Sequence, residues 1–211
     1  MTTSPVEIGN LALQHLGVTT FITDLTELSK EARNINLRWD RARRQALGAF
    51  DWSFARKRAA LAVHGTAAPE DDWGYRYEYP ADCLKARKIF NPFGWPDDAV
   101  PFSLETTASG AQMSILTDME SAELIYTFDQ TNYDIYPEHF IELLSVLLAY
   151  HIAYPITTKR EVKGDMLNIY QNLLSQAPAV DANENVDRGP RDAEWIRARG
   201  YTSYPRTIFE R

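Results

Sequence analysis

The spacing of apolar residues changes twice along this 211-residue chain, and that change most constrains its fold. Up to about residue 49, and again from about residue 137, apolar residues recur every three or four positions, as on one face of a helix. Between these stretches short segments alternate, and proline and glycine separate them as turns. We therefore expect an α+β fold, mainly α: a bundle of about four helices with a small antiparallel β region inserted at about residues 52–130.

The helix boundaries follow from residues that begin and end helices. Ser4 and Ser29 are suited to cap the first two helices, and Gly17 is suited to end the first. Pro155 is expected to end the third helix, whose wide apolar face should make it the most buried. The predicted helices span about residues 5–16, 30–49, 137–154 and 158–176.

The inserted β region is expected to form one small sheet. Its candidate strands lie at about residues 52–63, 75–79, 84–90, 112–116 and 123–128. Large aromatic side chains stand near the point where the helical period ends, and such side chains fill cores. The expected core anchors are Trp39, Phe50, Trp52 and Phe54.

Residues 1–177 are predicted to form one domain, and residues 178–211 a C-terminal arm. Ala179–Arg188 is polar and rich in turn formers, as in a linker. The aromatic and arginine residues beyond it are spaced too irregularly to form one face, so they are expected to be buried on another chain. The alternative is an arm that folds back on its own bundle. The candidate portal or subunit contacts in the arm are Trp195, Ile196, Arg197, Arg199, Tyr201, Tyr204, Ile208 and Phe209.

Charge is distributed unevenly along the chain. The formal net charge is −7, which argues against general adhesion to nucleic acid. Basic residues nevertheless concentrate between Arg33 and Arg58, whereas acidic residues dominate residues 66–136. These segments could be complementary faces between neighbouring subunits, a basic patch that touches DNA, or an ordinary solvated helix face. The candidate subunit or DNA contacts are Arg38, Arg41, Arg44, Arg56 and Arg58.

The sequence contains no recognisable catalytic or metal-binding motif. The four histidines lack metal-ligand spacing, and no nucleophile elbow, phosphate loop or dinucleotide fingerprint occurs. Cys83, the only cysteine, is interpreted as an inert packed thiol in a chain from a reducing compartment. No signal peptide is recognisable, and the apolar stretch Ile141–Ile156 is judged too short and too mixed to span a membrane. We therefore expect no catalytic residues, metal, cofactor or membrane partner.

The order of the motifs resembles the tail tubular protein A family of short-tailed phages, which are head-to-tail adaptors. Ile8–Gly17 is similar to the family's first helix, which also closes on a glycine. The second helix, entered through residues 29–33, ends in residues 49–55, which contain a Trp-x-Phe signature at Trp52–Phe54. Tyr79-Pro80 and Pro137-Glu138 follow in the expected order. The resemblance covers roughly residues 6–177 and is most specific over residues 8–58.

This resemblance implies a structural virion protein and no catalysis. Family members combine a helical bundle with a β insertion and form a ring, twelve-membered in the family, that docks under the portal protein. The ring receives the tail nozzle or tail fibres, and genomic DNA passes through its lumen without sequence-specific binding. The implied location is the head-to-tail interface of the virion, after synthesis in the host cytoplasm. The alternatives are a DNA-binding helical module that uses the Arg33–Arg58 cluster, and an enzyme whose site the sequence does not reveal.

Overall fold

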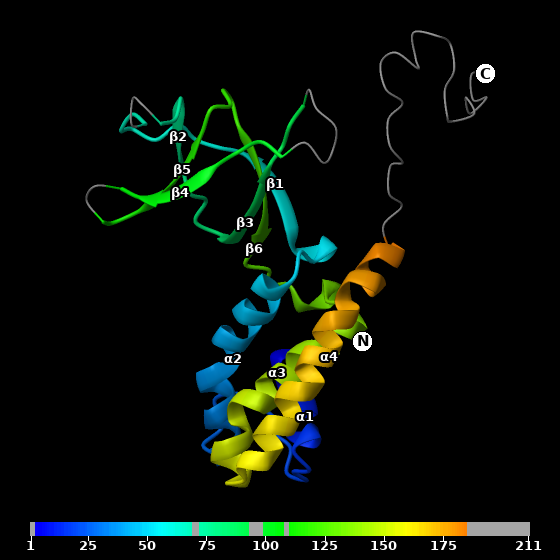
Figure 1. The fold of residues 1–211 in the computed structure, drawn as a ribbon. Helices are drawn as coiled ribbons and strands as arrows, with labels where there is room; N and C mark the ends of the chain where they lie inside the picture. The colour runs from blue at the N-terminus through cyan, green and yellow to red at the C-terminus, as the bar shows by residue number, and fades with distance from the viewer. Residues whose placement is uncertain (1–2, 69–71, 93–98, 108–109, 185–211) are drawn as a thin grey trace, which may run out of the picture.

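A computed structural model describes residues 3–68, 72–92, 99–107 and 110–184. A helical bundle and a β part are stacked end to end (Figure 1). The β part is inserted between the second and third helices of the bundle. The expected fold class, mainly α with an inserted antiparallel β region, is therefore confirmed.

The bundle is built around α3, Glu138–Thr157, which packs against the other three helices: α1, Pro5–His15; α2, Lys30–Ala49; and α4, Arg160–Glu184. The predicted caps are present. Ser4 Oγ accepts a hydrogen bond from Glu7 N at 3.1 Å, and Ser29 Oγ accepts one from Ala32 N at 3.2 Å. Gly17 follows α1 with a φ of 71°, a left-handed conformation that glycine adopts without strain. Local sequence thus determined the ends of α1 and the start of α2.

Two predicted helix ends are wrong, and both involve proline. α3 continues past Pro155 to Thr157 and ends at Thr158, which has a left-handed φ of 60°. α4 passes through Pro178 and reaches Glu184, so residues 179–184 are helical and not a linker. A proline removes one intrahelical hydrogen bond, and here both prolines are exposed while the neighbouring Ala153 and Ala177 are buried. Packing on the bundle outweighs that loss.

The extension of α4 moves the start of the predicted arm. Asp181 is buried, and its Oδ1 accepts a hydrogen bond from Ser53 N at 3.0 Å, at the base of the β part. Residues 178–184 therefore belong to the folded unit. The arm's candidate contact residues lie outside the described residues: Trp195, Ile196, Arg197, Arg199, Tyr201, Tyr204, Ile208 and Phe209.

Within the described residues, α3 alone is long and apolar enough to cross a membrane by length and composition. The expectation that this stretch is too short is therefore wrong, since the helix has 20 residues. However, 61% of its apolar window is buried inside the bundle. The same composition is typical of the central helix of a bundle.

The described residues of the β part form two antiparallel sheets of three strands each, instead of the one sheet expected. One has the order β1-β6-β3, with β1 at Arg56–Ala60, β6 at Glu123–Phe128 and β3 at Cys83–Ile89. The other has the order β2-β5-β4, with β2 at Tyr75–Glu78, β5 at Met113–Thr117 and β4 at Ser103–Thr106. Strand β4 was not predicted. It has only four residues, most of them exposed, so it lacks the alternation of buried and exposed positions that identifies a strand.

Aromatic residues fill the junction between the two parts. Trp52 is fully buried, and its Nε1 donates a hydrogen bond to the Ala46 carbonyl at 2.9 Å. Its ring lies 5.1 Å from those of both Phe50 and Phe140. Phe54 packs on Phe140 at 4.8 Å, and Trp39 is buried further along the bundle core. The junction aromatics therefore join the end of α2 to the start of α3, on either side of the β insertion.

Candidate interaction surface

The basic residues between Arg33 and Arg58 separate into three groups in the structure: the upper end of α2, strand β1 and the outer face of α2. At the upper end of α2, Arg43 is buried and pairs with Asp129. It also donates to the Gln130 carbonyl at 2.8 Å. Arg44, which is more exposed, bonds the other oxygen of Asp129 at 3.0 Å. Both arginines therefore attach α2 to the segment after β6, and Arg44 is already engaged within the chain.

The basic residues of β1 are also neutralised within the chain. Arg56 pairs with Asp51 at 3.1 Å, and Lys57 pairs with Asp82 at 2.6 Å. Arg58 pairs with Glu123 on the adjacent strand. The guanidinium of Arg58 also lies 3.4 Å from the centroid of the Phe90 ring, a cation–π contact. Of these two candidate partner contacts from sequence, Arg58 thus joins two strands of the β part, and Arg56 joins β1 to the segment after α2.

Asp82 accepts hydrogen bonds from two side chains of the β part, Lys57 and Tyr126. Burial alone would raise the pKa of Asp82, but hydrogen bonds from Lys57 and Tyr126 lower it below its usual value. Asp82 therefore stays ionised and stays paired with Lys57.

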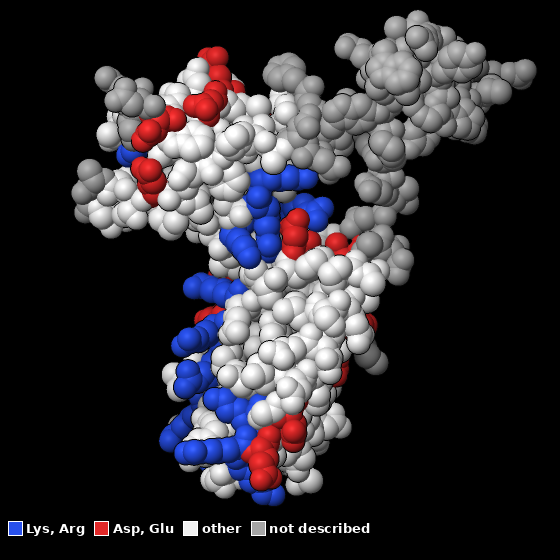
Figure 2. Space-filling model, viewed as in Figure 1, with Lys and Arg blue, Asp and Glu red and all other residues white. Residues whose placement is uncertain are grey.

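The outer face of α2 differs, because its arginines have no acidic partner among the described residues. Arg33, Leu37 and Arg41 follow one another at four-residue spacing and so share one face, with Arg38 beside them. Leu37 is 73% exposed, in the middle of this face. We call these four residues the basic stripe. Figure 2 shows Lys and Arg side chains running along the α2 edge of the bundle.

The inner edge of the basic stripe borders a half-buried histidine. His151 Nε2 on α3 lies 3.0 Å from Gln45 Oε1 on α2. Burial lowers the pKa of His151, and the charges of Arg38, Arg41 and Lys163 lower it further. Lys163 on α4 lies 4.9 Å from the Tyr150 ring centroid. Two helices, α2 and α4, therefore direct positive charge to one region, which could bind a carboxylate or a phosphate.

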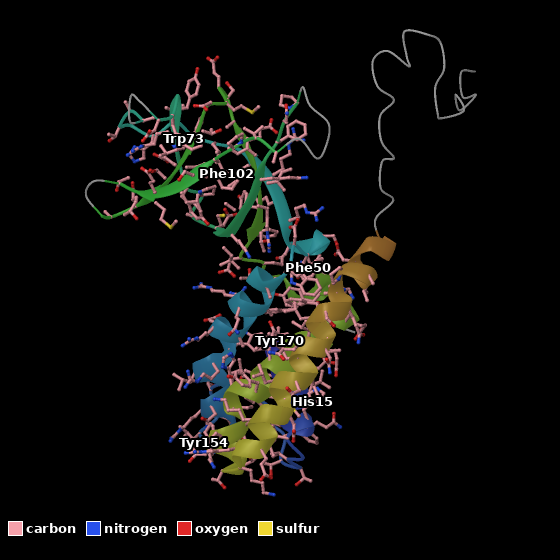
Figure 3. The ribbon with its side chains drawn as sticks, viewed as in Figure 1. His15, Phe50, Trp73, Phe102, Tyr154 and Tyr170 are labelled. Atoms are coloured by element: carbon pink, nitrogen blue, oxygen red, sulfur yellow. The ribbon has the colours of Figure 1, made fainter. Side chains whose placement is uncertain are left out.

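Exposed acidic residues gather at the far end of the β part. Asp72 precedes β2, whereas Asp118 and Glu120 lie in the turn between β5 and β6. Gly74 N donates to Asp118 Oδ1 at 2.9 Å, which holds these two loops together. Trp73 is partly exposed and lies in the first of these loops, between Asp72 and Gly74 (Figure 3). We call Asp72, Trp73, Asp118 and Glu120 the acidic tip.

A Ser, His and Glu cluster joins α1 to α3 but lacks catalytic geometry. His15 Nε2 lies 3.0 Å from Ser145 Oγ and 3.5 Å from Glu142 Oε1. A nucleophile–base pair needs the carboxylate on the other ring nitrogen. Here both partners face the same nitrogen, and the fully buried Ser145 hydroxyl donates to the Glu142 carbonyl at 2.8 Å. The cluster therefore serves as a contact between helices.

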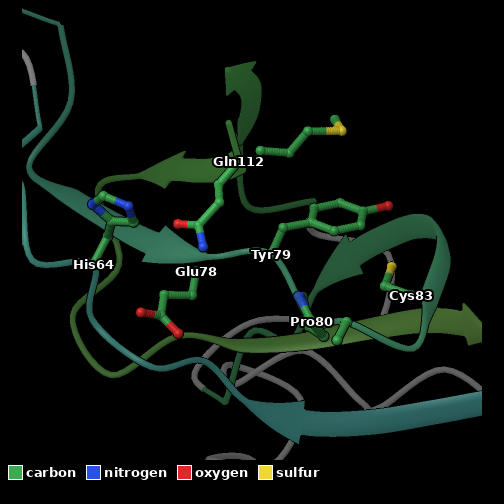
Figure 4. Close-up of a pocket in the computed structure, with 8 residues that line it drawn as sticks. His64, Glu78, Tyr79, Pro80, Cys83 and Gln112 are labelled. Carbon is green, nitrogen blue, oxygen red and sulfur yellow. The ribbon is translucent and has the colours of Figure 1, made fainter. Parts of the chain in front are cut away.

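The β part contains an open cavity of about 340 Å³ (Figure 4). It is lined by His64, Glu78, Tyr79, Cys83 and Gln112, among others. Burial raises the pKa of the Cys83 thiol, which keeps it protonated and poorly nucleophilic. Over the described ranges, no group of three or more His, Cys, Asp or Glu residues could hold a metal ion.

The sequence reading selected five arginines as partner contacts, and the structure separates them. Arg38 and Arg41 lie on the basic stripe, whereas Arg44, Arg56 and Arg58 are paired within the chain. Leu37 was missed, although it lies off the apolar face of its helix and among arginines. The sequence near each residue did not indicate the role of His151, Lys163 or Trp73, because the residues around them come from distant segments of the chain. No family model matches this sequence, and no curated protein matches it either.

Proposed function

We propose that this chain is a structural subunit of a phage virion, a head-to-tail adaptor. Copies of it form a ring beneath the portal protein, and the ring joins the portal to the tail nozzle or tail fibres around the DNA channel. The proposal starts from the resemblance to the tail tubular protein A family. The same resemblance suggests twelve subunits for the ring.

One observation carries the proposal: the motifs behind the resemblance lie at the framework positions of the fold. The segment Ile8–Gly17 is α1 with its glycine stop, and Trp52–Phe54 forms the aromatic junction between the bundle and the β part. Pro137-Glu138 begins α3, the helix on which the bundle is built. A helical bundle with a β insertion is also the architecture that the resemblance implies.

The distribution of charge supports a role in assembly. The basic stripe lies on the bundle and the acidic tip lies at the far end of the β part. Among the described residues, no carboxylate pairs with the arginines of the stripe and no cation pairs with the acids of the tip. A subunit that must meet identical neighbours gains orientation from complementary charged surfaces.

The test is assembly on the portal protein encoded by the same genome. Exposed charge pairs are individually weak, about 0.2–1 kcal/mol, so we expect the purified chain to sediment mostly as a monomer at micromolar concentration. With portal present, negative-stain electron microscopy should show a ring of added density on one end of the portal. Failure to bind portal, or a tight dimer that portal does not change, would contradict the proposal.

A DNA-binding helical module is the second candidate, and Arg33, Arg38 and Arg41 favour it because they have no acidic partner among the described residues. Against it, Arg43, Arg44, Arg56, Lys57 and Arg58 are neutralised by carboxylates, and the whole chain is acidic. Binding to duplex DNA whose affinity falls steeply with salt would support this alternative.

A further inference from the structure

Two exposed surfaces of this chain carry opposite charge and cannot meet within one molecule. The acidic tip lies beyond the end of β6 that is remote from the bundle, since β6 runs toward the bundle and ends next to Asp129. The basic stripe lies on α2 below the junction, since α2 runs upward and ends at Ala49. From the rise per residue of a helix and a strand, the two surfaces are on the order of 30 Å apart.

That separation exceeds the distance over which exposed charges interact at moderate salt. The screening length is about 10 Å at 0.1 M ionic strength. The attraction between these surfaces is therefore negligible within a chain and becomes useful only between chains.

We infer that the basic stripe of one subunit binds the acidic tip of a second copy, which gives a head-to-tail contact. This inference rests on the proposed adaptor function and specifies the surfaces that would join neighbouring subunits. A contact between two different patches of identical chains repeats around an axis, and it closes into a ring when the rotation permits. Arg33 and Arg41 would pair with carboxylates such as Asp72 and Glu120, all four of which are exposed.

An apolar residue on each surface favours a protein partner over DNA. Leu37 lies between Arg33 and Arg41 and is 73% exposed, and Trp73 stands next to Asp72 on the acidic tip. A leucine gains nothing against the phosphate backbone, whereas an apolar or aromatic anchor ringed by polar residues is typical of protein interfaces. Each surface therefore combines an apolar side chain with charges opposite in sign to those of the other surface.

Charge reversal at these exposed residues tests the contact with little risk to the fold. The stripe variant is Arg33→Glu/Arg41→Glu, and the tip variant is Asp72→Lys/Glu120→Lys. Asp118 is left unchanged, because it accepts the hydrogen bond from Gly74. The combined variant carries all four changes. The control, Lys88→Glu/Lys159→Glu, changes the net charge as much as the stripe variant does, at exposed positions outside both surfaces.

The variants are compared by sedimentation at low salt over a concentration series, without portal. Self-association of the stripe variant and of the tip variant should weaken by roughly tenfold or more, because each contact then repels. A mixture of the two should associate, because every stripe then meets a tip of opposite charge. Each variant carries two reversals and so changes the formal charge of −7 by four, to −11 for the stripe variant and −3 for the tip variant. Both variants stay acidic, so overall attraction does not drive the mixing. The combined variant should self-associate like the native chain, as should the control.

Several results would overturn the inference. One is a stripe variant that associates as well as the native chain; another is a mixture that fails to associate. A closed dimer in place of larger species would show a reciprocal contact and not a head-to-tail one. Loss of affinity for duplex DNA in the stripe variant, with self-association intact, would assign the stripe to nucleic acid. The portal experiment is separate: a native chain that self-associates through these surfaces but ignores portal would refute only the adaptor function.

Discussion

The helical bundle and the β part differ in whether their exposed basic residues pair with acidic residues of the same chain. On β1, each of Arg56, Lys57 and Arg58 pairs with an acidic side chain of the same chain. On the outer face of α2, Arg33, Arg38 and Arg41 have no acidic partner among the described residues, and the exposed Asp40 beside them pairs with Arg43 at 3.6 Å. The comparison shows that residues adjacent in sequence can be structural in one region and available to a partner in the other.

The two parts also differ in how they are stabilised. The bundle has one large apolar core around α3, which extends into the aromatic junction. The β part has a small core in which Tyr77 and Tyr126 are prominent. We therefore expect the β part to depend on the junction and on hydrogen bonds more than the bundle does.

Replacement of Trp52 by alanine should have the largest effect, because it removes the side chain that joins the two parts. Loss of a fully buried aromatic residue costs ~3–5 kcal/mol. Thermal unfolding followed by circular dichroism measures this. The matched control is Trp73→Ala, a partly exposed tryptophan on the β part, which should cost much less. Equal melting temperatures for the native chain and Trp52→Ala would show that Trp52 is no anchor.

Arg43→Met should follow, because Arg43 is the buried arginine that links α2 to the segment after β6. Loss of one partner from a buried ion pair costs about 3 kcal/mol or more. Asp129 keeps Arg44, so we expect a value at the lower end of that range in chemical denaturation. Arg44→Met is the control and should cost below about 1 kcal/mol, since the Arg44 side chain is 57% exposed. Similar costs for the two variants would mean that burial does not distinguish them.

Tyr77→Phe should weaken the β part without affecting the bundle. The Tyr77 hydroxyl donates to the Met119 carbonyl at 2.9 Å and lies 3.4 Å from Ala122 N, in a nearly dry environment. An unsatisfied buried polar group costs about 1–3 kcal/mol. Amide hydrogen exchange should quicken in β2, β5 and β6, while α3 keeps its protection. Equal acceleration in α3 would show that the two parts unfold together.

His151→Gln should give the smallest effect, a change in the pH dependence of stability. Because the folded-state pKa of His151 is lowered from 6.5, the unfolded chain binds this proton more readily. The native chain should therefore lose stability as the pH falls below about 6.5, and recover it as the pH rises. Glutamine at this position does not titrate, so the variant should lose less over the same window. Parallel stability profiles between pH 5 and 7.5 would argue against this environment for His151.

Sequence by itself determined the features that rest on local physical chemistry. The serine caps, the glycine stop after α1 and the apolar period of α2 specify their helices without help from distant residues. Burial of Trp52 also followed from its place at the end of a helical period. Pro155 misled the prediction of the end of α3, and the polar stretch after residue 178 misled that of α4. Packing on the bundle outweighed the loss of one hydrogen bond at each helix proline.

Tertiary structure alone decided which charges are available to a partner. Arg41 and Arg43 are two residues apart in one helix, yet Arg43 is buried against Asp129, which lies 86 positions away along the chain. The pairing of β1 with β6 brings Arg58 to Glu123, and the turn between β5 and β6 brings Asp118 to Gly74. Coulombic attraction between exposed groups acts over about 10 Å in solution, so it depends on which segments fold side by side. The sequence supplies the charged residues. The fold determines which of them, over the described part of the chain, pair with each other and which are left on the basic stripe and the acidic tip.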